Sequence, residues 1–343
     1  MALVNYLLWT IYVVTLPCKS AENQKQNQLI IGEWTFVSEE LLHHEKIHST
    51  TAPPIKAGFK SGYVFSKDGI CEDKLGYFNR LNRNYTQFLG TKTKFRLENN
   101  HLEIFDLAYK IWRSYQILKL DDKTLKLVLN DSVNAIYERS HYELAPKVPF
   151  DKIIVSSSGC LGSCPINDVI ISRDEKVIFN NEGFRQREGV FSSSITLSEF
   201  DEIEKRFRKT DLNKLKDKYA ASWTDDNEIT ISLIQNGRIY KTISDYGSQS
   251  PSELYWAYLP VIFLDQKLIL KSLSDNTNFY IRKIFSFEKD EKLIRLAQSE
   301  GFYLADLLQK QFLSIRFSSK NTLCRHLASK DRLKRRQMVV IIR

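Results

Sequence analysis

The chain has 343 residues, of which 43% are hydrophobic and 27% are charged, and this balance excludes an intrinsically disordered protein. Its 20 Phe and 16 Tyr residues favour β-strands. Much of the net charge of +9 lies in the tail that begins at Arg325. We find no folded basic face with aromatic residues between its cations, so we expect no nucleic-acid partner.

An apolar run occupies residues 2–16, which is too short for a membrane-spanning helix and is typical of a signal peptide. Cys18 ends this run, and a polar stretch follows at residues 19–28. The arrangement resembles a bacterial lipoprotein, whose acylated cysteine anchors the chain in the membrane. We therefore predict a signal/lipoprotein segment at 1–18 with lipidation at Cys18, a polar tether at 19–28, and a place in the bacterial cell envelope, facing the periplasm or the exterior. Ordinary secretion and an uncleaved anchor are the alternatives.

Residues 29–141 contain short runs of alternating apolar and polar residues separated by turn signals. The expected strands are residues 30–37, 62–66, 94–98, 102–105, 111–118, 124–129 and 135–139. Leu125, Leu127 and Leu129 share one face of their strand, as in a half-buried sheet. Strands at this spacing without a long helix predict an up-and-down antiparallel β-barrel.

The two ends of this region resemble small bacterial lipocalin-like domains. The matching residues are Gly32-Glu33-Trp34 at the first strand and Tyr137-Glu138-Arg139 at the last. The resemblance implies that Trp34 lies under Arg139 and that this cation–π pair closes the barrel end. It also implies a small apolar ligand in the barrel mouth, although small barrels are also filled by their own side chains.

The segment from His44 to His48 matches the metalloprotease pattern H-E-x-x-H, in which two histidines on one helix face bind zinc. Few residues precede it that could build a supporting sheet, and Pro53 and Pro54 follow closely. His44 and His48 are therefore weak metal candidates, and a metallohydrolase is the weaker functional alternative. We expect no resident metal or cofactor.

A proline-containing linker at 142–149 leads to residues 150–268, which predict an α+β domain with helices on one side of its sheet. Thr196 and Glu199 form a capping box before a helix whose apolar face contains Leu197, Phe200, Ile203 and Phe207. A second capping box is predicted at Ser250–Glu253, before another helix. The whole chain is thus expected to be mainly β with α+β: a lipocalin-like antiparallel barrel at 29–141 followed by this smaller domain.

This domain resembles an uncharacterised bacterial family, domain of unknown function 6438, whose signature is C-x-G-x-C-P. The signature falls on Cys160, Gly162, Cys164 and Pro165, and Asp225 is a further matching position. The family is typical of envelope lipoproteins and has no assigned activity. For Cys160 and Cys164 three roles remain open: a structural disulfide, which export favours, a thiol redox couple, and metal binding.

Residues 269–343 form a C-terminal helical and basic segment, with a helix predicted at 289–311 and strands at 313–317 and 338–342. No Ser/His/Asp set or phosphate-binding loop stands out in the sequence. The leading hypothesis is therefore a non-enzymatic envelope lipoprotein, attached to the membrane by its lipid anchor, that binds a small apolar ligand or an envelope protein. A thiol redox or metal-binding protein that uses Cys160 and Cys164 is the alternative.

Overall fold

The computed structural model describes residues 18–42, 60–79, 85–142, 144, 148–273, 280, 285–289, 292–318 and 338–341. For residues 18–23, 285–289, 292–294, 312–318 and 338–341 it describes the backbone alone. In this part of the chain, every helix is too short or too polar to cross a lipid bilayer. The predicted HExxH histidines, His44 and His48, lie outside the described residues.

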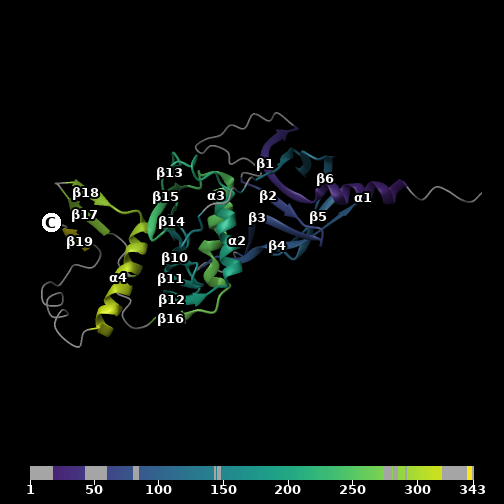
Figure 1. The fold of residues 1–343 in the computed structure, drawn as a ribbon. Helices are drawn as coiled ribbons and strands as arrows, with labels where there is room; N and C mark the ends of the chain where they lie inside the picture. The colour runs from purple at the N-terminus through teal and green to yellow at the C-terminus, as the bar shows by residue number, and fades with distance from the viewer. Residues whose placement is uncertain are drawn as a thin grey trace, which may run out of the picture. The chain divides into compact units, whose positions relative to one another are not determined.

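The chain forms two compact units, Met1–Lys74 with Lys92–His141, and Leu75–Thr91 with Tyr142–Arg343. Strands dominate both, and β1–β8 form a closed antiparallel barrel of which most residues belong to the first unit, so the predicted fold class is confirmed (Figure 1). The barrel strands are β1 (Gly32–Leu41), β2 (Gly62–Phe65), β3 (Ile70–Asn79), β4 (Gln87–Glu98), β5 (His101–Asp106), β6 (Ile111–Leu120), β7 (Thr124–Asn130) and β8 (Val133–Arg139).

Strand β3 is the barrel strand that the sequence pattern did not predict. Its sequence contains Glu72, Asp73 and Lys74 in succession, so the alternation of apolar and polar residues is interrupted. Lys74 is nevertheless buried, and its ammonium group lies 3.1 Å from the carboxylate of Glu33. A paired charge can therefore occupy a position where the pattern leads one to expect an apolar residue.

Large side chains fill the interior of the barrel. Trp34, Phe65, Leu102, Leu125 and Tyr137 are almost completely buried and belong to one apolar cluster. The ring centroids of Phe65 and Phe95 are 4.8 Å apart, and those of Tyr63 and Tyr137 are 5.5 Å apart. These contacts join side chains of β1, β2, β4 and β8 into one aromatic cluster inside the barrel.

Helix α1 (Cys18–Ile30) includes residues 19–28, where we had predicted a polar tether, and its residues 24–29 are mostly exposed. Its final residue, Ile30, is fully buried in the barrel core, and the carbonyl of Ile30 accepts a hydrogen bond of 2.7 Å from the indole of Trp34. Trp34 and Arg139 come together as the resemblance implied, with the guanidinium 4.3 Å from the centre of the indole ring.

The Arg139 guanidinium also binds three backbone carbonyls. It donates to Ile31 at 2.6 Å, to Asp122 at 2.7 Å, and to Leu29. Because the last carbonyls of a helix have no partner within the helix, these bonds stabilise the junction between α1 and β1.

We predict that Arg139→Ala lowers the free energy of unfolding of the barrel by about 2–4 kcal/mol, since it removes the cation–π contact and leaves several carbonyls without a donor. Hydrogen exchange of the barrel amides measures this unit separately from the second. Arg113→Ala is the control, because Arg113 forms a half-exposed ion pair with Asp106 and its loss should cost less than about 1 kcal/mol. Equal effects of the two variants would contradict a closing role for Arg139.

The second unit is built on an eight-stranded sheet in the order β13-β15-β14-β9-β10-β11-β12-β16. These strands are β9 (Lys152–Ser157), β10 (Ile166–Ser172), β11 (Lys176–Gly183), β12 (Gly189–Ser194), β13 (Lys218–Ala220), β14 (Glu228–Gln235), β15 (Arg238–Tyr246) and β16 (Lys271–Ser272). A separate three-stranded sheet contains β17 (Phe285–Lys289), β18 (Lys292–Arg295) and β19 (Met338–Ile341).

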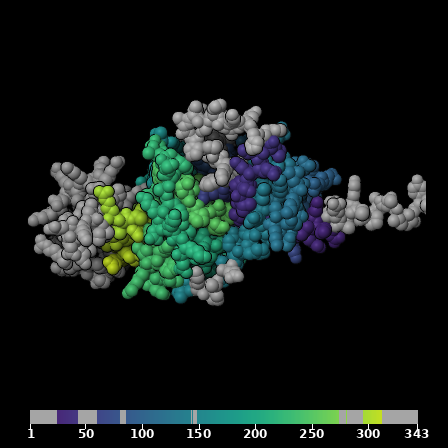
Figure 2. Space-filling view, turned by 90° about the horizontal axis from the view of Figure 1, so that it is seen from above, coloured from purple at the N-terminus to yellow at the C-terminus, as the bar shows by residue number. Residues whose placement is uncertain are grey.

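Helices cover both faces of the large sheet. Helices α2 (Leu197–Arg208) and α3 (Ser252–Ile262) pack on one face, as predicted, and the short 3-10 helix η1 (Leu264–Gln266) follows α3. Helix α4 (Gln298–Ser318) covers the opposite face, where Phe302, Tyr303 and Ala305 contact the sheet (Figure 1). In the space-filling view α4, in yellow, lies directly against the green surface of this unit (Figure 2).

Three predicted features of this unit are wrong. Residues 292–295 form strand β18 where a helix was expected, and residues 313–317 belong to α4 where a strand was expected. The second capping box does not form, because Pro251 precedes α3 without a side-chain cap and the Ser250 hydroxyl donates to Asp245. The first capping box, Thr196 with Glu199, is confirmed, although Leu197 is 44% exposed and lies off the buried face.

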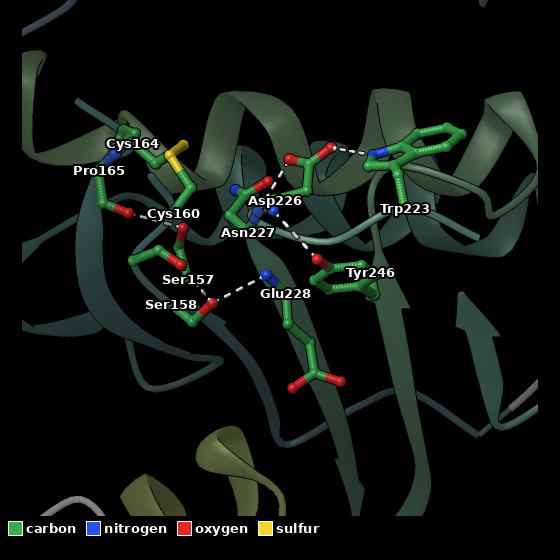
Figure 3. The surroundings of a disulfide bond; sticks show 11 residues. Ser157, Ser158, Cys160, Cys164, Pro165, Trp223, Asp226, Asn227, Glu228 and Tyr246 are labelled. Atoms are coloured by element: carbon green, nitrogen blue, oxygen red, sulfur yellow. Dashed lines mark hydrogen bonds between the residues drawn. A yellow bond between two sulfur atoms is a disulfide. The ribbon is translucent and has the colours of Figure 1, made fainter. Parts of the chain in front are cut away.

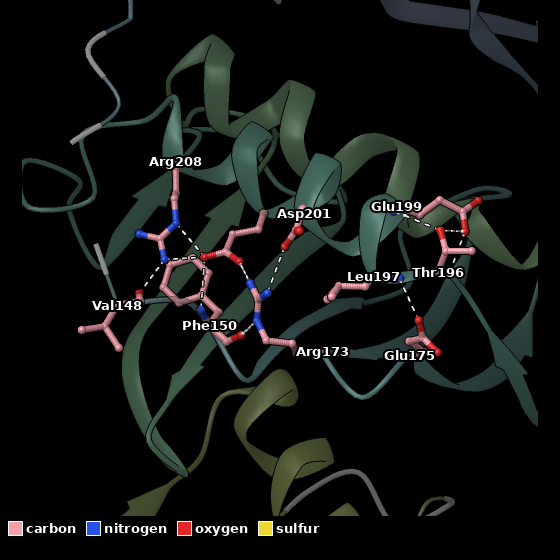
Figure 4. A network of polar contacts seen from close by, with 10 residues as sticks. Val148, Phe150, Arg173, Glu175, Thr196, Leu197, Glu199, Asp201 and Arg208 are labelled. Atoms are coloured by element: carbon pink, nitrogen blue, oxygen red, sulfur yellow. Dashed lines mark hydrogen bonds and ion pairs between the residues drawn. The ribbon is translucent and has the colours of Figure 1, made fainter. Parts of the chain in front are cut away.

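A charged network joins helix α2 to the residues that precede β9, and Figure 4 labels its members Phe150, Arg173, Asp201 and Arg208. The buried Glu204 carboxylate accepts hydrogen bonds from the guanidinium groups of Arg173 and Arg208 and, at 3.1 Å, from the backbone N–H of Phe150. Arg208 also lies over the Phe150 ring and donates to the carbonyl of Val148 at 2.7 Å. The carboxylate thus joins α2 to the residues that lead into β9.

We predict that Glu204→Gln destabilises the second unit by about 2–4 kcal/mol, because it leaves two guanidinium groups around a neutral amide. Asp201→Asn is the control at an exposed position of the same network. Asp201 accepts a hydrogen bond from Arg173 at 2.9 Å, but its side chain is 56% exposed. This variant should therefore lower the free energy of unfolding by less than about 1 kcal/mol. Urea unfolding, monitored by hydrogen exchange of the β9 amides, measures the free energy of unfolding of both variants. A Glu204→Gln protein as stable as Asp201→Asn would refute the role assigned to Glu204.

Candidate functional site

The residues that match the predicted family signature gather at one end of the large sheet. Strand β9 ends at Ser157, β10 begins at Ile166, β14 begins at Glu228, and β15 ends at Tyr246. Because these neighbouring strands are antiparallel, the connections 158–165, 221–227 and 247–251 all leave the sheet at the same end. We call this region the disulfide end.

Cys160 and Cys164 form a disulfide with their Cα atoms 5.7 Å apart. The short loop that they close presents Leu161, whose side chain is 84% exposed. Gly162 follows with a φ of +148°, a backbone conformation that disfavours any residue with a Cβ. The cysteines and the glycine of the signature thus hold one apolar side chain in solvent.

Neighbouring strands fix this loop by hydrogen bonds (Figure 3). The Ser157 hydroxyl donates to the carbonyl of Pro165 at 2.7 Å, and the Ser158 hydroxyl accepts from the N–H of Glu228 at 2.8 Å. The N–H of Leu161 donates to the carbonyl of Asp225 at 3.2 Å. Asp225 therefore contributes its backbone to the loop, while its carboxylate lies on an exposed residue.

Trp223 is the second apolar side chain of the disulfide end. It is 43% exposed, and its indole N–H donates to the Asp226 carboxylate at 3.0 Å. The N–H of Asp226 in turn donates to the Tyr246 hydroxyl at 3.0 Å (Figure 3). Gly247 allows this packing, since a Cβ there would lie 2.6 Å from the Cβ of Ala221. Local sequence patterns offered no reason to select Trp223, because its exposure depends on how the connections 221–227 and 247–251 pack together.

Asp245, which the sequence analysis missed, holds the third connection in place. The carboxylate is fully buried and accepts from the N–H of Ser250 at 2.9 Å, the Ser250 hydroxyl at 2.5 Å and the Tyr258 hydroxyl at 2.9 Å. Burial raises the pKa of Tyr258 well above its ordinary value, and the Asp245 charge adds to this effect. Tyr258 therefore stays protonated and donates to Asp245 throughout the physiological pH range.

Carboxylates are the charged groups of the disulfide end. Asp225, Asp226 and Glu228 follow one another closely, whereas the three connections 158–165, 221–227 and 247–251 contain no Lys, Arg or His. A negative environment raises the pKa of a thiol and so disfavours the thiolate that redox chemistry requires.

The remaining predicted site residues lie elsewhere. Trp34 and Arg139 belong to the first unit. Cys18 begins helix α1, and its side chain is outside the described part. No group of three or more His, Cys, Asp or Glu residues with metal-binding geometry occurs among the residues that the structure describes.

Residues 151–265 match the family model described as Domain of unknown function (DUF6438). This range contains the disulfide end and its four strands. A search of the curated proteins found no match. Among solved structures, the chain is similar to an uncharacterized protein from Bacteroides eggerthii DSM 20697, with 10% identity and a TM-score of 0.20, over 32% of this chain and 98% of that chain.

Proposed function

We propose that this chain is a non-enzymatic protein of the bacterial cell envelope, anchored to the membrane by a lipid on Cys18, which binds a protein partner through the disulfide end. The observation that carries the proposal is the disulfide-closed loop, which presents Leu161 at 84% exposure at the same end of the sheet as the exposed Trp223. Exposed apolar side chains on a rigid loop are typical of contact surfaces.

The disulfide supports export, because such bonds form and persist in oxidising compartments and are rare in the cytosol. The carboxylates around it support a structural bridge and not a redox couple. The filled barrel, in turn, favours a partner on the surface over an apolar molecule in the barrel mouth.

The partner surface predicts that a photo-crosslinking amino acid at position 161 captures a discrete envelope protein in the native host. The same amino acid at position 269 is the matched control, since Ile269 is 86% exposed in the same unit. The crosslink at 161 should disappear in a Cys160→Ser/Cys164→Ser background, because the open loop no longer holds the side chain in one position. Equal products at 161 and 269, or a product that persists without the disulfide, would contradict the proposal.

The lipid anchor predicts that cells fed with labelled palmitate incorporate the label into the chain and lose it in the Cys18→Ala variant. Cys71→Ala is the control, because this thiol is buried inside the barrel and is inaccessible to acylation. The Cys18→Ala protein should also move from the detergent phase to the aqueous phase on Triton X-114 partitioning. Full labelling of Cys18→Ala would rule out acylation at this residue.

A further inference from the structure

Strand β15 lies next to one edge of the large sheet, and most of its length has no strand on its outer side. The short edge strand β13 pairs only with Ser244, Asp245 and Tyr246 (Figure 1). Residues 238–243 pair with β14 on the inner side, and no strand among the described residues continues the sheet beyond them. The sheet therefore has an open edge at residues 238–243, and such an edge can accept an added strand.

The backbone of Thr242 points out of this open edge. The N–H of Ser244 donates at 2.8 Å to the carbonyl of Asp217, on the outer side of β15. Because backbone groups alternate between the two sides of a strand, the N–H and the carbonyl of Thr242 also point outward. Within the described part of the chain, no backbone group bonds to them. An extended peptide can satisfy both groups, since it offers a carbonyl and an N–H in the spacing of a β-ladder.

A groove of about 770 Å³ follows the open edge and has a wall on each side. Leu212 and Asp217, which precede β13, belong to one wall, and Ala297 and Glu300 at the start of α4 belong to the other. We call this space the edge groove, and its size suits a short peptide. The two walls favour a single extended segment over a second copy of the chain, whose own helices on both faces of the sheet would meet them.

A β-bulge at Tyr240 gives the edge groove one apolar side chain on each face of the sheet. The register with β14 shifts between Lys241 and Ile239, and the Tyr240 ring lies 6.1 Å from that of Phe150 in the core beneath α2 and α3. Ile239 is opposite Ile234, which belongs to the core beneath α4. Tyr240 is 44% exposed and Ile239 is 42% exposed, so both can contact a peptide on the edge.

Glu300 supplies an uncompensated negative charge to the α4 wall of the edge groove. The half-buried carboxylate accepts from the Thr242 hydroxyl at 2.7 Å and from the backbone N–H just before α4. No cation among the described residues lies within ion-pair distance of it. On the opposite wall, by contrast, Lys241 pairs with Asp217 at 3.2 Å. A lysine or arginine of a ligand beside Thr242 would therefore pair with Glu300.

We propose that the edge groove binds an extended peptide of a partner protein, which adds to residues 238–243 as a further strand. On the α4 face the peptide carries a basic residue at Glu300 and an aliphatic residue at Ile239. These two peptide residues are two positions apart, as are Ser232 and Ile234, which lie opposite Thr242 and Ile239 on β14. The inference concerns another part of the second unit and does not rest on the disulfide end.

The test measures fluorescence anisotropy of the labelled peptide Ser-Thr-Lys-Thr-Val-Thr-Ser with the full chain, and the peptide should bind with a Kd below about 1 mM. An analogue with glutamate in place of the lysine should bind about fivefold more weakly or worse, because its charge meets Glu300. N-methyl groups on one alternate set of peptide amides should abolish binding. On the other set they should leave the affinity within about twofold, since only every second N–H of an added strand faces β15.

The variant Thr242→Pro removes the outward N–H and should weaken binding by roughly tenfold or more, while the fold persists because proline is tolerated where a strand's N–H faces away from the sheet. Thr242→Val is the matched control: it also loses the hydroxyl but keeps the N–H, and its affinity should stay within about threefold. Glu300→Gln should abolish the preference for the lysine peptide over its glutamate analogue. Glu202→Gln should retain that preference, because Glu202 is exposed on α2 and does not line the groove.

Circular dichroism melts verify that all variants fold. The proposal is overturned if the lysine peptide does not bind, if Thr242→Pro binds it as tightly as Thr242→Val, or if the two N-methylated peptides bind equally. Analytical ultracentrifugation tests the other occupant. A dimer of the chain that Thr242→Pro dissociates would assign the open edge to a second copy, and this result would also overturn the proposal.

Discussion

Strand β9 has apolar side chains on both of its faces, and the second unit is organised around this constraint. Ile153 and Val155 point into the core beneath α2 and α3, whereas Ile154 between them points into the core beneath α4. A strand of this kind needs a helix layer on each side, because a face without helices would expose its apolar side chains to water. The same strand ends at Ser157, whose hydroxyl donates a hydrogen bond to the carbonyl of Pro165 in the disulfide loop. The rigid sheet thus positions the exposed loop.

Local patterns predicted most of the elements because their signals lie within one strand or one turn. Leu125 and Leu127 are buried as their alternation required, and the Thr196–Glu199 capping box forms as expected. Strand β3 was missed since Lys74 is buried with a charged partner that is distant in sequence. Residues 292–295 were assigned to a helix because their apolar residues fit both periods, and only the pairing with β17 decides between them.

The candidate site was predictable only in part. The signature cysteines identified the disulfide loop, but Trp223 and Asp245 reach it through packing that no local pattern encodes. Asp245 in particular is a buried carboxylate that forms no ion pair within the described part of the chain, and three donors from the turn and helix that follow β15 satisfy it.

Helix α1 changes how an acylated Cys18 would hold the barrel. A flexible polar segment would allow the barrel to take up many positions and orientations relative to the lipid. Here thirteen residues from Cys18 to Ile30 are helical, which corresponds to about 20 Å of stiff rod. Its far end is fastened to the barrel by Trp34 and Arg139. An acyl group on Cys18 would therefore restrict both the distance of the barrel from the bilayer and its orientation.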